Sequence, residues 1–101
     1  MKKIINGKKY DTETAKEVAE YCSWHGKNDF RYFEETLYRK KNGEFFLYGE
    51  GRCASPYTED VSDGTTGGSG IAPLTENEAK KWAEEKIDSS KYEAIFGEVE
   101  E

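Results

Sequence analysis

Residues 34–51, EETLYRKKNGEFFLYGEG, hold the pattern that decides the fold of this chain. Phe33, Glu35 and Leu37 alternate with Glu34, Thr36 and Tyr38 before Asn42-Gly43, and Phe45, Leu47 and Gly49 alternate with Phe46, Tyr48 and Glu50 after it. A period of two residues is typical of a β-strand, and Asn-Gly accepts the positive φ angles of a tight turn. The stretch therefore predicts a β-hairpin, which the same pattern extends to residues 29–52.

The residues of this hairpin are expected to have two roles, one in the core and one in contact with a partner. One face is expected to be scaffold and holds Phe33, Leu37, Phe45 and Leu47. Five further residues are candidates for display to a partner: Tyr38, Arg39, Lys40, Tyr48 and Glu50. Because both faces carry aromatic rings, either both are covered or one aromatic face stays exposed.

The first quarter of the chain predicts a second hairpin and a helix. In KKIINGKKYD, Asn6-Gly7 separates two short runs and favours a type I′ turn. The next stretch, DTETAKEVAEYCSW, is expected to be helical, with Asp11 or Thr12 as its cap. Its apolar residues recur at helical spacing and predict one buried stripe of Ala15, Val18, Ala19 and Cys22.

The last quarter predicts two more helices. Thr75 and Glu78 form a capping-box pattern at the start of the first, TENEAKKWAEEKID. Its predicted buried stripe is Ala79, Trp82, Ala83 and Ile87. SSKYEAIFG predicts a shorter helix that Gly97 ends, with Tyr92, Ile95 and Phe96 facing inward.

These elements fit one domain over residues 1–101. The expected fold class is α+β: an antiparallel sheet of two hairpins packed against an N-terminal helix and two C-terminal helices. A Gly/Ser/Thr-rich region at about 54–72 has no periodicity and is expected to be a flexible loop. The acidic tail, residues 98–101, is expected to be solvated.

The charge of the chain is uneven. The net charge is −6, and residues 75–101 contribute −5 through nine acids and four bases. An acidic surface repels nucleic acid at long range and suits a basic protein partner. The same surface also serves solubility alone, which is the plainer explanation.

The cysteines and the hydropathy pattern bear on the compartment. Cys22 and Cys53 are too few for a disulfide framework. No apolar run is long enough for a signal peptide or a membrane span. The chain is therefore expected in the cytoplasm, without membrane contact and with reduced thiols.

A zinc site is the one cofactor that the residues leave open. Cys22 and His25 form a Cys-x-x-His pair, and Cys53 is a possible third ligand, with Asp29 or Asp60 as a fourth. The alternative is a buried thiol beside a surface histidine. Since structural zinc sites usually show two paired ligand sets, the expectation is that the protein has no cofactor.

Enzymatic activity is not expected. Cys22 and His25 could act as a nucleophilic pair only with an exposed, ionised thiol, and the helical stripe predicts that Cys22 is buried. The neighbouring acids Glu34-Glu35 and Glu84-Glu85 point apart on a strand or helix, so neither pair suggests carboxylate catalysis.

The hairpin tip offers a nucleic-acid alternative. Arg39, Lys40 and Lys41 gather there, and tyrosines lie along the strands: Tyr32, Tyr38 and Tyr48. Basic residues interleaved with aromatics can bind single-stranded RNA. Lysines also crowd turns for solubility, and the domain is acidic as a whole, so direct nucleic-acid binding is the less expected reading.

Three segments resemble a known family: KKIINGKKYDTETAKEVAEY at 2–21, the hairpin at 34–51 and IAPLTENEAKKWAEEKIDSSKYEAIFGEVEE at 71–101. They are similar to small proteins carried by phages, plasmids and integrative elements of Firmicutes. Some proteins with this opening resemble type II-A anti-CRISPR proteins, which inhibit the Cas9 nuclease. The resemblance carries over no catalytic residue and gives Cys22 and Cys53 no role.

The resemblance implies that the partner is Cas9 or its complex with guide RNA. Because the channels of Cas9 are lined with Lys and Arg, acidic side chains can stand in for phosphates. The acids expected to do so are Glu84, Glu85, Asp88 and Glu93, with the aromatic hairpin as anchor. An adaptor or regulator of another host protein has the same sequence features, and the inhibited step and the oligomeric state stay open.

Overall fold

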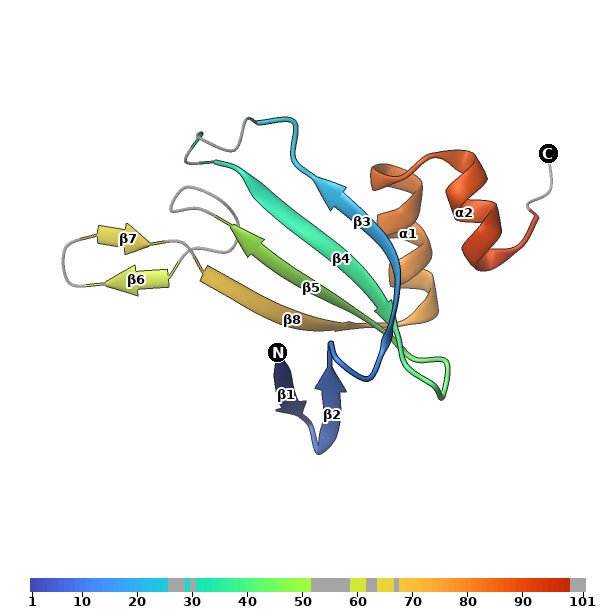
Figure 1. Ribbon diagram of the computed structural model, residues 1–101, viewed down its shortest axis with the longest axis horizontal. Coiled ribbons are helices and arrows are strands. Elements are labelled where there is room, and N and C mark those ends of the chain that lie inside the picture. The colour runs from blue at the N-terminus through green and yellow to red at the C-terminus, as the bar shows by residue number, and fades with distance from the viewer. Residues whose placement is uncertain (26–28, 30, 52–58, 62–63, 67, 99–101) are drawn as a thin grey trace.

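The computed structural model describes residues 1–25, 29, 31–51, 59–61, 64–66 and 68–98. The molecule is elongated, with extents of 49 × 33 × 20 Å. Within the described residues the elements are, in order, β1 (Lys2–Ile5), β2 (Lys8–Asp11), β3 (Lys16–Cys22), β4 (Phe33–Arg39), β5 (Phe45–Gly51), β6 (Glu59–Val61), β7 (Gly64–Thr66), β8 (Gly68–Leu74), α1 (Glu76–Lys86) and α2 (Ser89–Phe96) (Figure 1).

An antiparallel four-stranded sheet organises the molecule, in the order β3-β4-β5-β8. The β1–β2 and β6–β7 hairpins form two further two-stranded sheets. The two helices follow the last strand of the large sheet. The α+β class expected from the sequence is therefore confirmed.

The central hairpin has the predicted turn. Lys40 N donates to Glu44 O at 2.8 Å and Gly43 N donates to Lys40 O at 2.9 Å. Gly43 has a φ of 92°, and Asn42 Oδ1 accepts a hydrogen bond of 3.0 Å from Glu44 N. The Asn-Gly pair thus supplies both the backbone geometry and a side-chain acceptor that closes the turn.

The N-terminal hairpin is also confirmed. Asn6 and Gly7 have φ angles of 51° and 78°, as a type I′ turn requires. The sequence led us to expect this hairpin within the large sheet, but β1 and β2 form a separate two-stranded sheet. The hairpin packs on the face of the large sheet instead, where the Tyr10 ring meets the Phe46 ring edge-on at 5.5 Å.

The predicted N-terminal helix is wrong, because its second half is strand β3. The capping signal produces a single turn: Glu13 N donates to Asp11 Oδ1 at 2.9 Å and Ala15 N donates to Asp11 O at 3.1 Å. The chain then pairs with β4 from Lys16 onward. Pairing with an adjacent strand has overridden a weak local preference for helix.

A β-bulge explains why this strand resembled a helix. The register between β3 and β4 shifts between Glu17 and Ala19. As a result the adjacent residues Val18 and Ala19 both join the core under the helices, while Ala15 packs on the other face and Cys22 is exposed. Four apolar residues that suggested one helical stripe therefore point to two faces of a sheet.

Both C-terminal helices are confirmed. The Thr75 side chain accepts a hydrogen bond of 3.1 Å from Glu78 N, and Thr75 N donates to Glu78 Oε1 at 2.9 Å, which completes the capping box. α2 begins at the cap Asp88 and ends at Gly97, whose φ is 91°. These caps satisfy backbone groups that a helix end leaves unpaired.

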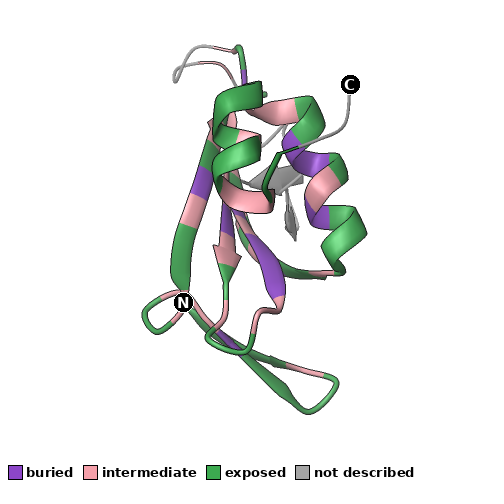
Figure 2. Cartoon of the chain, turned by 90° about the vertical axis from the view of Figure 1, so that its right-hand side faces the viewer, coloured by how far each residue is buried: buried purple, intermediate pink, exposed green. Residues whose placement is uncertain are grey.

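The face of the large sheet that α1 and α2 cover is called here the helix face. Ala79, Trp82 and Ala83 lie on the side of α1 that is turned to the sheet, and Figure 2 shows the outer side exposed. The buried core on this face consists of Ala19, Leu37, Phe45, Leu47, Ala79, Trp82 and Ala83. Tyr92, Ile95 and Phe96 of α2 pack against it, as the sequence predicts.

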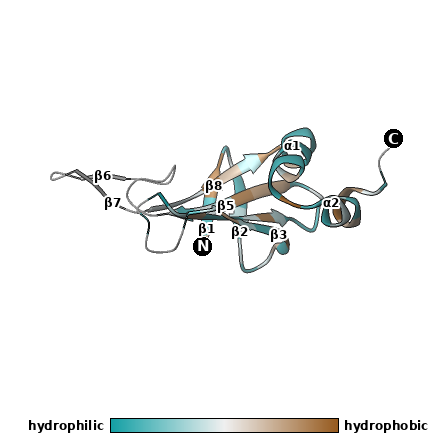
Figure 3. Ribbon diagram, turned by 90° about the horizontal axis from the view of Figure 1, so that it is seen from above, coloured by the Kyte–Doolittle hydropathy of each residue, from teal (hydrophilic) through white to brown (hydrophobic). Residues whose placement is uncertain are grey.

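On the opposite face of the sheet, the hairpin face, the described part of the chain provides cover at one end. Tyr10, Phe46 and Ile71 form its buried core, with Tyr38 and Tyr48 packed against them. Seen from above, α1 lies on one side of the sheet and the N-terminus toward the other (Figure 3). Both faces therefore carry aromatic cover, but the cover on the hairpin face is partial.

The predicted loop at about 54–72 is wrong in two places, because β6 and β7 pair as a hairpin within it and β8 begins at Gly68. This strand pairs with β5 along its length, from Gly51↔Gly68 to Phe45↔Leu74. Its two glycines and Pro73 are not typical of a strand, so the sequence did not predict it, but proline is tolerated on an edge strand. Much of the remaining loop and the tail from 99 lie outside the described residues; Glu98 is exposed.

Candidate functional site

The hairpin face is ordered by strand register into three rows across β3, β4, β5 and β8. The row nearest the N-terminal hairpin holds Glu17, Tyr38, Phe46 and Pro73. The middle row holds Glu20, Thr36, Tyr48 and Ile71. The far row holds Cys22, Glu34, Glu50 and Ser69. In these rows the strands carry four acids and no lysine or arginine.

Three of these acids, Glu20, Glu34 and Glu50, form with Thr36 and Tyr48 what is called here the acidic face. Each acid comes from a different strand, and Glu34 and Glu50 are direct register partners. Glu20 and Glu50 are exposed and Glu34 is half-buried. Like charges placed directly opposite each other on a sheet repel, so the acidic face carries an unfavourable interaction within the free protein.

Glu34 is held by donors from its own side of the sheet. The hydroxyl of Tyr32 donates a hydrogen bond to Glu34 Oε1, and Cys22 Sγ lies 4.0 Å from the same oxygen. The hydrogen bond to Glu34 raises the pKa of Tyr32, because ionised tyrosine could no longer donate it. The Glu34 carboxylate is thereby fixed in position at the centre of the far row.

The two tyrosines predicted to face a partner differ in their burial and in their contacts. Tyr38 stacks on Phe46, with ring centroids 5.1 Å apart and planes 7° apart, so it belongs partly to the core. Burial and the nearby Glu17 carboxylate raise the pKa of Tyr38. Tyr48 is half-buried in the middle row, and its hydroxyl lies 3.4 Å from Glu50 Oε2.

Arg39 and Lys40 lie at the turn end of β4, away from Glu50. The Arg39 guanidinium lies over the Phe45 ring at 5.6 Å, on the helix face. The Lys40 ammonium lies 3.8 Å from the centroid of the Tyr10 ring. The five display candidates of the central hairpin therefore do not form one surface.

The acids predicted from the C-terminal segment lie on the other side of the sheet. Glu84 and Glu85 are exposed on α1, and Glu93 is exposed on α2. Asp88 has a structural role, because its side chain accepts a hydrogen bond of 2.8 Å from Lys91 N at the start of α2. The sheet separates these acids from Tyr48 and Glu50.

The possible zinc ligands are not seen together. Cys22 is exposed, which corrects the expectation that it is buried, and His25 Nδ1 lies 3.3 Å from Ser23 Oγ. Cys53 lies outside the described residues. In the part of the chain that is described, no three His, Cys, Asp or Glu side chains are close enough to hold a metal ion. Asp60 lies on β6.

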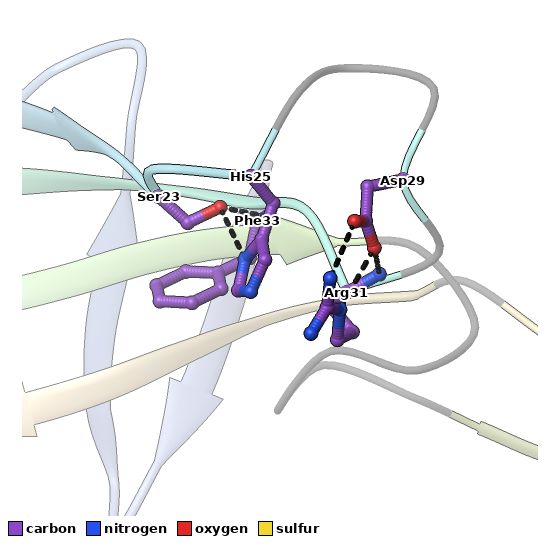
Figure 4. A network of polar contacts seen from close by, with 5 residues as sticks. All are labelled: Ser23, His25, Asp29, Arg31 and Phe33. Carbon is purple, nitrogen blue, oxygen red and sulfur yellow. Dashed lines mark hydrogen bonds and ion pairs between the residues drawn. The ribbon is translucent and has the colours of Figure 1, made fainter.

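Polar contacts link five residues at and between the ends of β3 and β4: Ser23, His25, Asp29, Arg31 and Phe33 (Figure 4). Buried Ser23 accepts a hydrogen bond of 3.2 Å from Phe33 N and donates its own N–H to Phe33 O at 2.9 Å. Arg31 makes two side-chain contacts with Asp29, at 3.0 and 2.8 Å. This fork of hydrogen bonds holds the pKa of Asp29 well below its usual range, so Asp29 is engaged by Arg31.

Trp24 is an exposed aromatic residue that sequence reasoning missed. It lies two residues after the end of β3, and 81% of its surface is accessible. Its ring lies 4.1 Å from that of His25, and the Arg31 guanidinium lies 5.7 Å from its centroid. Exposed tryptophans of this kind are frequent anchors in protein interfaces.

Glu20 was missed as a site residue because of a wrong element, and Glu34 because it was considered only as a neighbour of Glu35. Residues 11–24 were expected to be helical, so no sheet face was assigned to Glu20. A period-two reading of KEVAEYC would have placed Glu20 and Cys22 on one face of a strand. The alignment of that strand with Glu34 and Glu50 comes only from the register.

Comparison of the chain with protein-family models, curated proteins and solved structures gives no match. In the described residues, no helix is both long and apolar enough to cross a membrane.

Proposed function

We propose that this protein acts by binding rather than by catalysis, and that its acidic face binds a basic surface of a partner protein. One observation carries the proposal: three strands place Glu20, Glu34 and Glu50 together on a sheet face whose rows contain no base. A partner that brings lysines or arginines to this face gains favourable electrostatic contacts with every row that it covers.

The cross-strand pair gives this surface an energetic reason to bind cations. Glu34 and Glu50 repel each other in the free protein because they are register partners. An arginine or lysine placed between them replaces that repulsion with two attractive contacts. Binding thus relieves a repulsion that opposes folding in the free protein, and this relief stabilises the complex.

Aromatic residues supply the apolar part of the interface. Tyr48 lies half-buried within the acidic face, whereas Tyr32 is buried and only holds Glu34 in place. Tyrosine provides a large contact area with few rotatable bonds, so fixing it on binding loses little entropy. Trp24, which is exposed at the end of β3, extends the apolar surface available to a partner.

The partner that we propose is a type II-A Cas9, alone or with its guide RNA. The resemblance of the chain to small mobile-element proteins suggests this partner, and the acidic face suits the basic channels of Cas9. In this proposal the protein is an anti-CRISPR inhibitor, and its carboxylates occupy positions that phosphates of guide or target would take.

The test is DNA cleavage by a type II-A Cas9, with the protein added before or after guide loading. Inhibition only before loading indicates competition for the guide channel, whereas inhibition after loading indicates a block of target entry or cleavage. No inhibition of several such enzymes by the folded protein would remove Cas9 as the partner. The adaptor for another host protein would then be the better hypothesis.

Matched charge variants locate the interface. Glu20→Gln with Glu50→Gln removes two charges from the acidic face, and Glu84→Gln with Glu85→Gln removes two from α1. We expect the first pair to weaken Cas9 binding about tenfold or more and the second to change it little, since only desolvated charge pairs contribute strongly. The reverse result would move the interface to α1 and exclude the acidic face.

A further inference from the structure

The turn end of the large sheet carries two grooves that are lined by cations. The first has a volume of about 430 Å³ and lies between the N-terminal hairpin and the β4–β5 turn. Its lining residues are Lys9, Asp11, Thr14, Ala15, Lys40, Lys41 and Asn42. Three bases and one acid give this groove a net formal charge of +2.

The second groove, of about 240 Å³, lies where α2 meets the edge of the sheet. Its lining residues are Lys16, Glu17, Val18, Arg39, Lys91, Ala94 and Ile95. Its net formal charge is also +2, from three bases and one acid. Val18, Ala94 and Ile95 give it a larger apolar part than the first groove, where Ala15 alone is apolar.

The linings of the two grooves hold consecutive residues at the end of β4. Arg39 lines one groove and its neighbour Lys40 lines the other, and Lys16 is the register partner of Arg39. The six cations of the two grooves are called here the basic belt: Lys9, Lys16, Arg39, Lys40, Lys41 and Lys91. They come from segments that are far apart in the sequence, so the fold assembles the belt.

The cations of the belt keep their charge available to a ligand. Among the described residues, none of the six forms an ion pair with an acid. The Lys40 and Arg39 side chains lie over the Tyr10 and Phe45 rings, which position them without neutralising them. The neighbouring Glu44 carboxylate is engaged by Lys8 at 3.2 Å.

We propose that the basic belt binds the phosphodiester backbone of a nucleic-acid strand. Two adjacent cationic grooves suit successive phosphates, because a strand carries one negative charge at each nucleotide. The apolar wall of the second groove offers contact to sugars or base faces. This site is separate from the acidic face, so its failure would leave the proposed function untouched.

The net charge of −6 does not prevent such binding. The acid of the acidic face that lies nearest to the belt along a strand is Glu20, four residues from Lys16 on β3, which is about 13 Å at roughly 3.3 Å per residue. Charges are screened over about 8 Å at physiological salt, so the acidic face begins about one and a half screening lengths from the belt. The charge that a nucleic acid meets at the belt is therefore local and positive.

The test is fluorescence anisotropy with a labelled oligouridine of about 16 nucleotides, with the full chain, between about 50 and 200 mM salt. We expect binding that weakens steeply as salt rises. Lys16→Gln with Lys41→Gln should lower the affinity about tenfold and the slope of log K against log salt by about 1 to 2, because two phosphate contacts are lost.

The control is Lys3→Gln with Lys81→Gln, which removes the same total charge from exposed positions outside the grooves. Neither Lys16 nor Lys41 has an ion pair in the described part of the chain, so the belt variant should fold normally, and its circular dichroism spectrum checks this. Equal affinities of the two variants, or no binding at about 50 mM salt, would overturn the proposal.

Further probes identify the source of the phosphates. An oligothymidine of the same length tests whether the 2′-hydroxyl contributes: equal binding supports backbone recognition alone, and tighter binding of RNA adds a contact to the ribose. Vesicles that contain phosphatidylserine test a membrane as the source. Binding to vesicles but to neither oligonucleotide would contradict the nucleic-acid assignment.

Discussion

The two faces of the large sheet differ in how completely they are covered. On the helix face, α1 and α2 cover a continuous apolar cluster that runs from Ala19 to Phe96. On the hairpin face, the β1–β2 hairpin covers Phe46 at one end and leaves Glu20 and Glu50 exposed. The first arrangement serves stability, and the second combines a small core with a free surface.

The difference shows how one sheet can supply both a core and an interface. Leu37 and Phe46 lie on neighbouring strands and opposite faces, and each is 0% exposed. Both faces therefore contribute to folding at the turn end of the sheet. The middle and far rows of the hairpin face carry acids: Glu20 lies in the middle row, and Glu34 and Glu50 are register partners in the far row.

The largest expected effect comes from truncating the two buried side chains. Leu37→Ala should lower the free energy of unfolding by about 2–5 kcal/mol and Phe46→Ala by about 3–5 kcal/mol, since each leaves a cavity. Urea denaturation measures both. A loss below about 1 kcal/mol for Phe46→Ala would mean that the N-terminal hairpin adds little to the core.

The β1–β2 hairpin and α1, which cover the two faces, depend on different local signals. Two variants test these signals separately. Gly7→Ala forces a side chain onto a φ of 78° in open space, so only backbone strain acts, at about 1–2 kcal/mol. Thr75→Ala removes the α1 cap and should lower the free energy of unfolding by about 1 kcal/mol.

Thermal unfolding followed by circular dichroism measures both variants. Amide exchange should show increased opening of β1–β2 in the Gly7 variant and of α1 in the Thr75 variant. If amide exchange increases equally in β1–β2 and α1 in both variants, the hairpin and the helix unfold as one unit, and the two faces do not differ in their stability.

A smaller effect of opposite sign is expected in the far row. Glu50→Gln removes the repulsion with Glu34 and should raise the free energy of unfolding by about 0.2–1 kcal/mol. Glu84→Gln on α1 is the control, and a surface position of this kind should stay within about 0.5 kcal/mol. Destabilisation by Glu50→Gln would show that the pair does not oppose folding.

The smallest effects concern acid sensitivity. A hydrogen bond from Lys8 lowers the pKa of Glu44, and the backbone N–H of Thr75 lowers that of Glu78. Each carboxylate therefore stabilises the fold above its unfolded pKa of 4.5, and this contribution is lost as pH falls through the lower folded pKa.

Glu44→Gln and Glu78→Gln should each reduce the fall in melting temperature between about pH 7 and pH 3. Glu44 ties the N-terminal hairpin to the central turn, and Glu78 belongs to the capping box of α1. An unchanged pH profile in both variants would place the acid sensitivity at other carboxylates, such as Asp29.

The sequence determined most local structure of this protein. Asn6-Gly7 and Asn42-Gly43 specify their turns through backbone φ angles, and the box of Thr75 and Glu78 specifies a helix start. These signals depend on residues within a few positions of one another. They can therefore be read without knowledge of the rest of the chain.

The tertiary structure alone decided the rest. Whether residues 16–22 form a helix or a strand depended on pairing with β4, and the bulge there imitates helical spacing. Gly-rich β8 exists because β5 offers it an edge. The acidic face and the basic belt follow from strand register and from the docking of a hairpin and a helix, which are contacts between residues distant in sequence.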